Sequence, residues 1–284
     1  MTLLSETQAR VSQLFDRDGD MLEHDGRSIV LSHGERRPNA AVLLHGMTAS
    51  PKQFIEIAEA LHASNYNVIV PRLPRHGHRD RLTEVLIGLS TDELKSVARD
   101  ALEFARGLGD RVTVIGFSVG GLLAAWVAQH YAIERAVCIA PFLGVAWLPA
   151  TVSNQLARMA LRLPNRFGWW DPIRKARQMP AHGYPRFSTH AIARAQRFAA
   201  ELMQEARATA PRASSIVLVT NSREMTVNNA QVRKLTGRWR NHPATKIETF
   251  EFDDLPFCHD IIEPLRHPGV TARVYPKLLD LIIR

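Results

Sequence analysis

Gly116-Phe117-Ser118-Val119-Gly120-Gly121 stands where an apolar run that predicts a strand, 112–116, meets an apolar helical pattern, 118–130. These residues match G-x-S-x-G, a motif that places a serine nucleophile on a sharp turn between a strand and a helix. Such a turn forces the serine into an unfavourable backbone conformation, so its neighbours Gly116 and Gly120 must lack side chains. The alternative is an ordinary glycine-rich turn. The strand-to-helix context favours Ser118 as a nucleophile at the C-terminal edge of a sheet.

The alternation of strand and helix extends in both directions from this turn. The segments 40–45, 67–70, 112–116, 135–139, 216–220 and 246–252 are predicted strands, and the first of them, AAVLLH, is a continuous apolar run. Apolar residues recur with the spacing of a helix at 51–61, 91–106, 118–130 and 228–240, between these segments, and at 270–283, after the last of them. Strands that alternate with helices form parallel sheets through right-handed crossovers. The sequence therefore predicts an α/β fold, a mostly parallel central sheet with helices on both faces. Before residue 40, we expect an N-terminal helix and one or two antiparallel strands near 28–32.

The alternation stops after Pro141 and resumes at residue 214. Residues 142–213, which we call the insertion, contain no convincing strand but two helical patterns, one on Leu156, Met159, Ala160 and Leu163 and one over 192–206. The sequence thus predicts an α/β core, residues 1–141 and 214–284, and a helical cap, residues 142–213. The insertion also holds eleven Lys and Arg against three Asp and Glu, which accounts for the whole net charge of +8.

The composition argues against several classes of protein. With 284 residues, 45% of them hydrophobic, the chain is neither disordered nor fibrous and can bury a large core. No run approaches the ~18 apolar residues of a spanning helix, and residues 1–10 lack the pattern of an export signal. Cys138 and Cys258 form no disulfide framework and lack metal-site spacing. We therefore expect a cytoplasmic protein, and because the positive charge is confined to one segment, we do not expect nucleic-acid binding.

A serine hydroxyl needs a base within hydrogen-bond reach to act as a nucleophile. His259 follows the predicted strand at 246–252, which in a parallel sheet leaves it at the same edge as Ser118. In the usual chain order an acid stands between the serine and the histidine, and Glu224 is the acid that follows the strand at 216–220. The sequence predicts a triad of Ser118, Glu224 and His259, with Asp253 or Asp254 as the fallback for the acid.

Two backbone N–H groups are needed to bind the negatively charged oxygen of the tetrahedral intermediate. Val119, the residue after the nucleophile, is expected to supply one of these groups. Met47 is expected to supply the other, because His45-Gly46-Met47 closes the first long strand where the chain turns over the sheet edge. For His45 itself, we expect a structural role in holding this loop.

Five segments resemble successive landmarks of the α/β-hydrolase family, especially its carboxylesterases and monoglyceride-lipase-like members. They are LLHGMTASP (43–51), RLPRHGH (72–78), GFSVGG (116–121), NSREMTVNN (221–229) and PFCHDIIEP (256–264). The resemblance implies that Ser118 is the nucleophile, that His259 is the base and that Glu224 replaces the family's usual Asp. A second departure is Arg75, where a glycine often precedes His76-Gly77. The family commonly inserts a lid at the position of the insertion.

Such an insertion forms the roof of a substrate pocket, and Trp147, Trp169 and Trp170 are its candidate substrate-binding residues. The alternative is that these rings form the core of the cap itself. The excess of arginine has three interpretations: a solvated face, which we favour, a site for an acidic substrate group, or peripheral contact with anionic lipid headgroups. No stable membrane insertion is expected. His76-Gly77-His78 lacks further ligands, so we expect neither a metal nor an organic cofactor.

The sequence therefore predicts a serine hydrolase that cleaves carboxylic esters, with short to medium acyl chains or monoacylglycerol-like, through an acyl-enzyme on Ser118. The same residues would serve a thioesterase, an amidase, a C–C bond hydrolase or an acyltransferase. An alternative of another class is a non-catalytic ligand-binding protein that keeps the fold. The partner is a small-molecule ester in the favoured interpretation, and the oligomeric state stays open.

Overall fold

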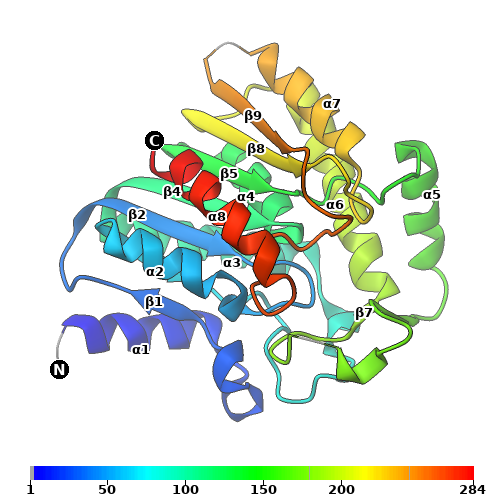
Figure 1. Ribbon diagram of the computed structural model, residues 1–284, viewed down its shortest axis with the longest axis horizontal. Helices are drawn as coiled ribbons and strands as arrows, with labels where there is room; N and C mark the ends of the chain where they lie inside the picture. The colour runs from blue at the N-terminus through cyan, green and yellow to red at the C-terminus, as the bar shows by residue number, and fades with distance from the viewer. Residues whose placement is uncertain (1–2, 179, 243) are drawn as a thin grey trace.

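One central sheet of seven strands, in the order β1-β3-β2-β4-β5-β8-β9, organises the computed structural model of the chain (Figure 1). The structure describes residues 3–178, 180–242 and 244–284; residues 1, 2, 179 and 243, which fall within the predicted core and cap, lie outside the described residues. The strands are β1 (Ile29–Leu31), β2 (Arg37–Leu44), β3 (Tyr66–Val70), β4 (Gly109–Phe117), β5 (Arg135–Ile139), β8 (Ser215–Asn221) and β9 (Lys246–Phe252). β1 is antiparallel to β3, and the other neighbours are parallel.

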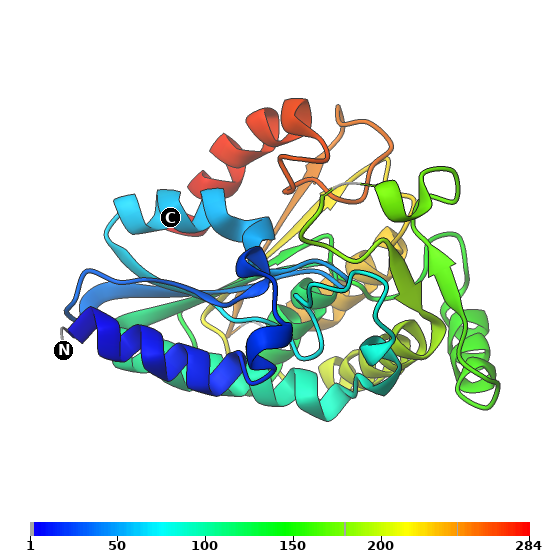
Figure 2. The ribbon, with the colours of Figure 1, turned by 90° about the horizontal axis from the view of Figure 1, so that it is seen from below.

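The central strands are buried because helices pack against both faces of the sheet. β2 and β4 pair in parallel, with Val42 opposite Val114, and residues 40–44 are all buried. The helices α2 (Ile55–Ala63) and α8 (Pro268–Ile283) cover one face (Figure 2). The other face is covered by α1 (Leu3–Phe15), α3 (Thr91–Leu108), α4 (Val119–His130) and α7 (Asn229–Arg240). The prediction of a mostly parallel α/β fold is confirmed.

The predicted elements differ from the observed ones mainly at their ends. The strands predicted at 135–139 and 246–252 coincide with β5 and β9. The helix predicted from Pro51 begins as a 3-10 turn, residues 51–54, before α2 starts at Ile55. The weak N-terminal pattern corresponds to α1 and to a single antiparallel strand, β1. None of the helices in the described ranges has the length and apolar character to span a bilayer.

The insertion lies between β5 and β8, which are neighbours in the sheet. It forms α5 (Ala150–Ala160), β6 (Phe167–Trp169), β7 (Arg186–Ser188) and α6 (Thr189–Ala208). β6 and β7 pair as a small antiparallel sheet, contrary to the expectation of helices alone. The sequence did not indicate these strands because three residues are too few to show an alternating pattern.

α5 and the turn that follows it expose three of the four apolar residues whose spacing predicted a helix. Leu156, Met159 and Leu163 are 47%, 56% and 59% exposed. The helix instead buries Ser153 and Ala157, small residues that allow close packing against α6. The periodicity thus identifies the helix, but it does not identify the side that meets the neighbouring helix.

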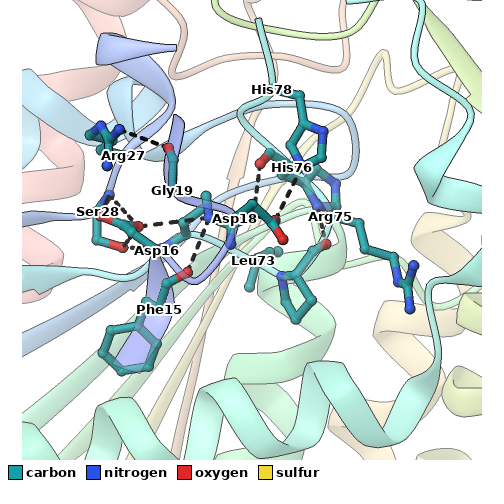
Figure 3. Close-up of polar contacts among 12 residues, drawn as sticks. Phe15, Asp16, Asp18, Gly19, Arg27, Ser28, Leu73, Arg75, His76 and His78 are labelled. Atoms are coloured by element: carbon teal, nitrogen blue, oxygen red, sulfur yellow. Dashed lines mark hydrogen bonds and ion pairs between the residues drawn. The ribbon is translucent and has the colours of Figure 1, made fainter. Parts of the chain in front are cut away.

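A cluster of buried ion pairs ties the segment after α1 to the loop that follows β3 (Figure 3). The Arg72 side chain is 3% exposed; its Nη1 lies 2.8 Å from Asp18 Oδ2, and its Nε lies 3.7 Å from Asp16 Oδ1. His78 Nε2 also lies 3.1 Å from Asp18 Oδ2, and Ser28 Oγ donates to Asp16 Oδ1. These contacts fix the loop 71–78, whose Leu73 N in turn donates to His45 Nε2 at the edge of the sheet.

Candidate active site

Ser118 occupies the turn between β4 and α4 with φ +55° and ψ −114°. This conformation is unfavourable for a residue with a side chain, and two glycines make it possible. A Cβ on Gly116 would lie 1.9 Å from Gly120 O, and a Cβ on Gly120 would lie 1.8 Å from Leu44 O. Ser118 N donates to Ile139 O, which holds the turn against β5. The hydroxyl is therefore presented at the C-terminal edge of the sheet.

His259 lies in the loop after β9, beside the serine. Its Nε2 is 2.8 Å from Ser118 Oγ, and its Nδ1 is 2.8 Å from Glu224 Oε2. When Nδ1–H donates to the carboxylate, the Nε2 lone pair faces the hydroxyl, which is the tautomer that can accept a proton from Ser118. Asn221 Nδ2 donates to Pro256 O and Cys258 O and so fixes the loop that carries His259.

Glu224 is the acid that contacts His259. Its side chain is 1% exposed, and its Oε1 accepts hydrogen bonds from Thr226 N and Val227 N. Burial raises the pKa of the Glu224 carboxyl, but the charge and hydrogen bond of His259 and the two backbone N–H groups outweigh burial and lower the pKa. The fallback acids lie elsewhere: Asp253 is exposed, and Asp254 forms an exposed ion pair with Arg273.

Met47 and Val119, the predicted oxyanion residues, line the same cavity as Ser118. The loop that carries Met47 is held by His45, which is fully buried and whose Nε2 accepts a hydrogen bond from Leu73 N. Burial, helped by the nearby His76, lowers the pKa of His45 well below its usual value, so the ring stays neutral and can accept. This geometry gives His45 a structural role and no contact with the serine in the described part of the chain.

The cavity at Ser118 has a volume of about 210 Å³ and is bounded by both the core and the insertion. Phe142, Ile192 and Trp170 contribute apolar surface, whereas Gln53 and Glu263 belong to a polar wall. Arg266 and His267 extend this polar wall along the loop that follows His259. A cavity that combines an apolar part with a polar part next to a nucleophile suits a substrate with two chemically different ends.

The three predicted tryptophans lie in different surroundings. Trp170 lines the cavity; its Nε1 donates to Thr48 Oγ1, and its ring packs on Phe187 with centroids 4.5 Å apart. Trp147 is 81% exposed and borders a separate surface depression beside Glu224 and Asn228. Trp169 lies in β6, opposite Arg186. Of the three rings, Trp170 is the one that the described structure brings to the cavity beside Ser118.

Sequence reasoning missed Gln53, which links the two loops of the site. Its Oε1 accepts from Gly46 N and its Nε2 donates to Asp260 Oδ2, so the loop of Met47 is tied to the residue after His259. The signal in the sequence is a glutamine next to the apolar stripe of a helix, where a polar side chain must find buried partners. Over the described ranges, no group of three or more His, Cys, Asp or Glu residues is placed to hold a metal ion.

Several known proteins resemble this chain. A thermostable monoacylglycerol lipase from Bacillus sp. (strain H-257) is 29% identical over 100 residues, a match that covers 35% of this chain and 38% of the lipase. A metagenome-derived lipolytic enzyme superposes with a TM-score of 0.68 at 16% identity over 91% of this chain and 99% of its own. The Paleococcus ferrophilus monoacylglycerol lipase superposes with a TM-score of 0.66 at 17% identity over 89% of this chain and 97% of its own. At these identities the two solved structures share the fold.

The family comparison covers the site as well as the sheet. The model of the alpha/beta hydrolase family matches residues 41–268, a range that begins in β2, includes Ser118, Glu224 and His259, and ends at the start of α8. Because this match extends over more than half of the sequence, the chain belongs to the alpha/beta hydrolase family.

Proposed function

We propose that the protein is a serine hydrolase that cleaves carboxylic esters through an acyl-enzyme on Ser118. The observation that carries the proposal is the unbroken hydrogen-bond chain from Ser118 Oγ to His259 Nε2 and from His259 Nδ1 to Glu224 Oε2, with both distances 2.8 Å. Such a chain combines a nucleophile, a base and a group that orients the base. A cavity next to the serine provides space for a substrate.

The reaction proceeds in two steps. Ser118 Oγ attacks the ester carbonyl carbon while His259 Nε2 takes the hydroxyl proton, and the imidazolium then protonates the leaving alcohol. Water next attacks the acyl-enzyme while His259 takes its proton, and the imidazolium then returns that proton to Ser118 Oγ as the bond to the acyl group breaks and the carboxylic acid leaves. Glu224 holds the ring tautomer and stabilises the imidazolium in both steps. These steps need no metal or organic cofactor.

The oxyanion of each tetrahedral intermediate is bound by Met47 N–H and Val119 N–H. Val119 is the first residue of α4, so the positive end of the helix dipole also faces the developing charge. Met47 and Val119 border the cavity together with Ser118, which supports this assignment.

The substrate is a small-molecule ester with an apolar acyl part, and residues 142–213 act as the cap that covers it. Phe142, Ile192 and Trp170 offer apolar surface for a short to medium acyl chain, and the polar wall accommodates the alcohol. The partial match to a monoacylglycerol lipase supports a monoacylglycerol-like ester. Trp170 is the tryptophan proposed to contact substrate, since Trp147 is 81% exposed.

Ser118→Ala tests the assignment directly. The variant is expected to lose more than about 10³-fold of kcat on p-nitrophenyl butyrate, because no other group takes the place of the nucleophile. It should unfold at the wild-type temperature, since alanine fits the same turn. Ester hydrolysis at the wild-type rate by the folded variant contradicts the proposal.

Two alternatives are separated by simple assays. A thioesterase, an amidase, a C–C bond hydrolase or an acyltransferase would use the same triad, and rates on acyl thioesters or aryl amides far above those on esters would indicate one of them. A non-catalytic ligand-binding protein would leave Ser118 unreactive toward a fluorophosphonate probe. The strained turn at Ser118 argues against a pure binder, because binding alone does not need it.

A further inference from the structure

A closed polar circuit lies behind the candidate oxyanion loop, and one of its members comes from the insertion. The circuit, which we call the polar ring, consists of Ser50, Gln53, Asp260, Glu263 and His182. Each of these residues is at most 8% exposed. Buried polar groups of this kind are costly unless each finds its partner, so the ring is a strong constraint on the segments that carry it.

Three segments of the chain meet in the polar ring. Gln53 N donates to Ser50 O at 3.0 Å, and Gln53 Nε2 donates to Asp260 Oδ2 at 3.0 Å. Asp260 Oδ1 accepts from Glu263 N at 3.1 Å. His182 closes the ring, with Nδ1 3.0 Å from Ser50 Oγ and Nε2 3.1 Å from Glu263 Oε2. The 3-10 turn before α2, the loop after β9 and the insertion are therefore joined.

His182 lies between Ser50 and Glu263, with one ring nitrogen toward each side chain. Ser50 Oγ donates its single hydrogen to Asp25 O, so it must accept a hydrogen bond from His182 Nδ1–H. His182 Nε2 then lies 3.1 Å from Glu263 Oε2. In the described structure both atoms are buried without a hydrogen-bond partner, so this contact supplies the polar neighbour of each atom.

The polar ring is connected to both loops of the proposed active site, the loop of Met47 and the loop of His259. Gln53 Oε1 accepts from Gly46 N, the residue before Met47, and Asp260 is the residue after His259. We propose, on the basis of the proposed function, that His182 is a positioning residue. Through Glu263 it holds the loop of His259 and the loop of Met47 in the relative placement that the tetrahedral intermediate requires.

Loss of His182 leaves Glu263 Oε2 buried without a polar neighbour, since the side chain is 2% exposed and Leu265 N donates to the other oxygen, Oε1. An unpaired buried charge is strongly unfavourable, so the loop after β9 shifts until the carboxylate reaches water or another donor. A displacement of about 1 Å between reacting groups lowers the rate by up to about 10²-fold. Because the effect lies in the geometry of the reacting groups, it lowers kcat and leaves KM nearly unchanged.

The test measures p-nitrophenyl butyrate hydrolysis by the full chain. Wild-type activity and its loss in Ser118→Ala are established first, so that failure of the proposed function is recognised separately. His182→Ala is then expected to lower kcat by about 10–100-fold with KM changed less than about 3-fold. The matched control is His190→Ala, another histidine of the insertion, whose Nε2 contacts Leu163 O; it should retain wild-type kcat.

Two substitutions of Glu263, by alanine and by glutamine, provide a second test. Glu263→Ala should lose as much kcat as His182→Ala, and the double variant should lose no more than either single variant. Glu263→Gln should recover at least about 5-fold over Glu263→Ala, because its amide N–H donates to a neutral His182 Nε2. A trifluoromethyl ketone, whose bound form mimics the tetrahedral intermediate, should bind His182→Ala more weakly in proportion to the loss of kcat/KM.

Wild-type kcat in folded His182→Ala, or additive losses in the double variant, would overturn the inference. If His182→Ala does not fold, His182→Gln replaces it, since a glutamine fills most of the volume but offers one amide in place of two ring nitrogens. It should lower kcat by at least about 5-fold, and unchanged kcat in this variant would equally reject the role of His182.

Discussion

At the scale of the residue, the acid of the proposed triad is a glutamate, whose side chain is one methylene longer than that of aspartate. Glu224 folds back over its own turn, so that Oε1 binds Thr226 N and Val227 N while Oε2 faces His259 Nδ1. The resemblance to the family implied that Glu224 replaces the usual aspartate, and in the structure the glutamate side chain reaches His259 Nδ1. The carboxylate is thus fixed before substrate arrives, which is what orientation of the imidazole requires.

Glu224→Gln tests the acid. The amide NH₂ of glutamine can donate to His259 Nδ1 and so favour the wrong ring tautomer, and a neutral amide does not stabilise the imidazolium as a carboxylate does, so kcat is expected to fall by about 10³–10⁴-fold. Steady-state hydrolysis of p-nitrophenyl butyrate measures the change. The control is Asp254→Asn, which removes an exposed acid paired with Arg273 and should leave kcat within about 2-fold of wild type. Near-wild-type turnover by Glu224→Gln would remove Glu224 from the triad.

At the scale of the element, the segment that follows α1 supports the site through the loop after β3. Asp18 and Asp16 hold Arg72, and the neighbouring Leu73 N holds His45. Burial raises the pKa of Asp18, but the hydrogen bond from His78 and the charge of Arg72 outweigh burial and lower the pKa below its ordinary value of 3.8. A carboxyl whose folded pKa is lowered stabilises the fold above the unfolded pKa and loses that stabilisation as the pH falls through the folded pKa.

Asp18→Asn should therefore destabilise the protein in a pH-dependent way. At pH 7 the free energy of unfolding is expected to fall by about 1–2 kcal/mol, since hydrogen bonds to charged groups are lost at a partly exposed site. Below pH 3.8 the wild type progressively loses the same stabilisation, so the difference between the two proteins should shrink. Urea unfolding at pH 7 and pH 3 measures this, with the exposed Asp20→Asn as control. A difference independent of pH would contradict the charge-based explanation.

At the scale of the whole molecule, positive charge and exposed apolar side chains coincide on the insertion. Leu156, Met159 and Leu163 are 47–59% exposed, and Arg158 and Arg162 lie between them in sequence. The sequence alone favoured a solvated basic face. The exposed apolar residues on α5 and on the turn after it favour contact with a membrane, because apolar side chains next to cations suit the surface of an anionic bilayer.

We expect the protein to sediment with vesicles that contain phosphatidylglycerol at low salt and to be released at high salt, because contacts between exposed charges are screened. Replacing Leu156, Met159 and Leu163 by serine should weaken binding by at least about 10-fold, since burial of each side chain contributes about 1 kcal/mol or more. Met21→Ser, at a 57% exposed residue outside the insertion, is the control. Equal vesicle binding by the triple variant would restore the interpretation of a solvated face.

Local sequence patterns predicted much of this fold because the conformation of a strand or a helix depends largely on the residues within it. Buried parallel strands need continuous apolar runs, as in β5 at 135–139, whereas β9 at 246–252 lies at the edge of the sheet and alternates polar and apolar residues. Elements of three residues, such as β6 and β7, carry no periodicity and were missed. The candidate site was indicated by the order of Ser118, Glu224 and His259 along the chain, since each follows a strand and parallel strands end at one edge.

Taken by itself, the sequence determined the α/β class, the strained turn at Ser118 and the edge at which the predicted site would lie, because these depend on residue type and spacing within one element. Tertiary structure alone decided which acid meets His259, that Trp170 borders the cavity while Trp147 faces solvent, and that His182 reaches Glu263 across 81 residues of chain. Such contacts depend on how distant segments pack against each other. Spacing within a segment carries no information about its partner across the fold.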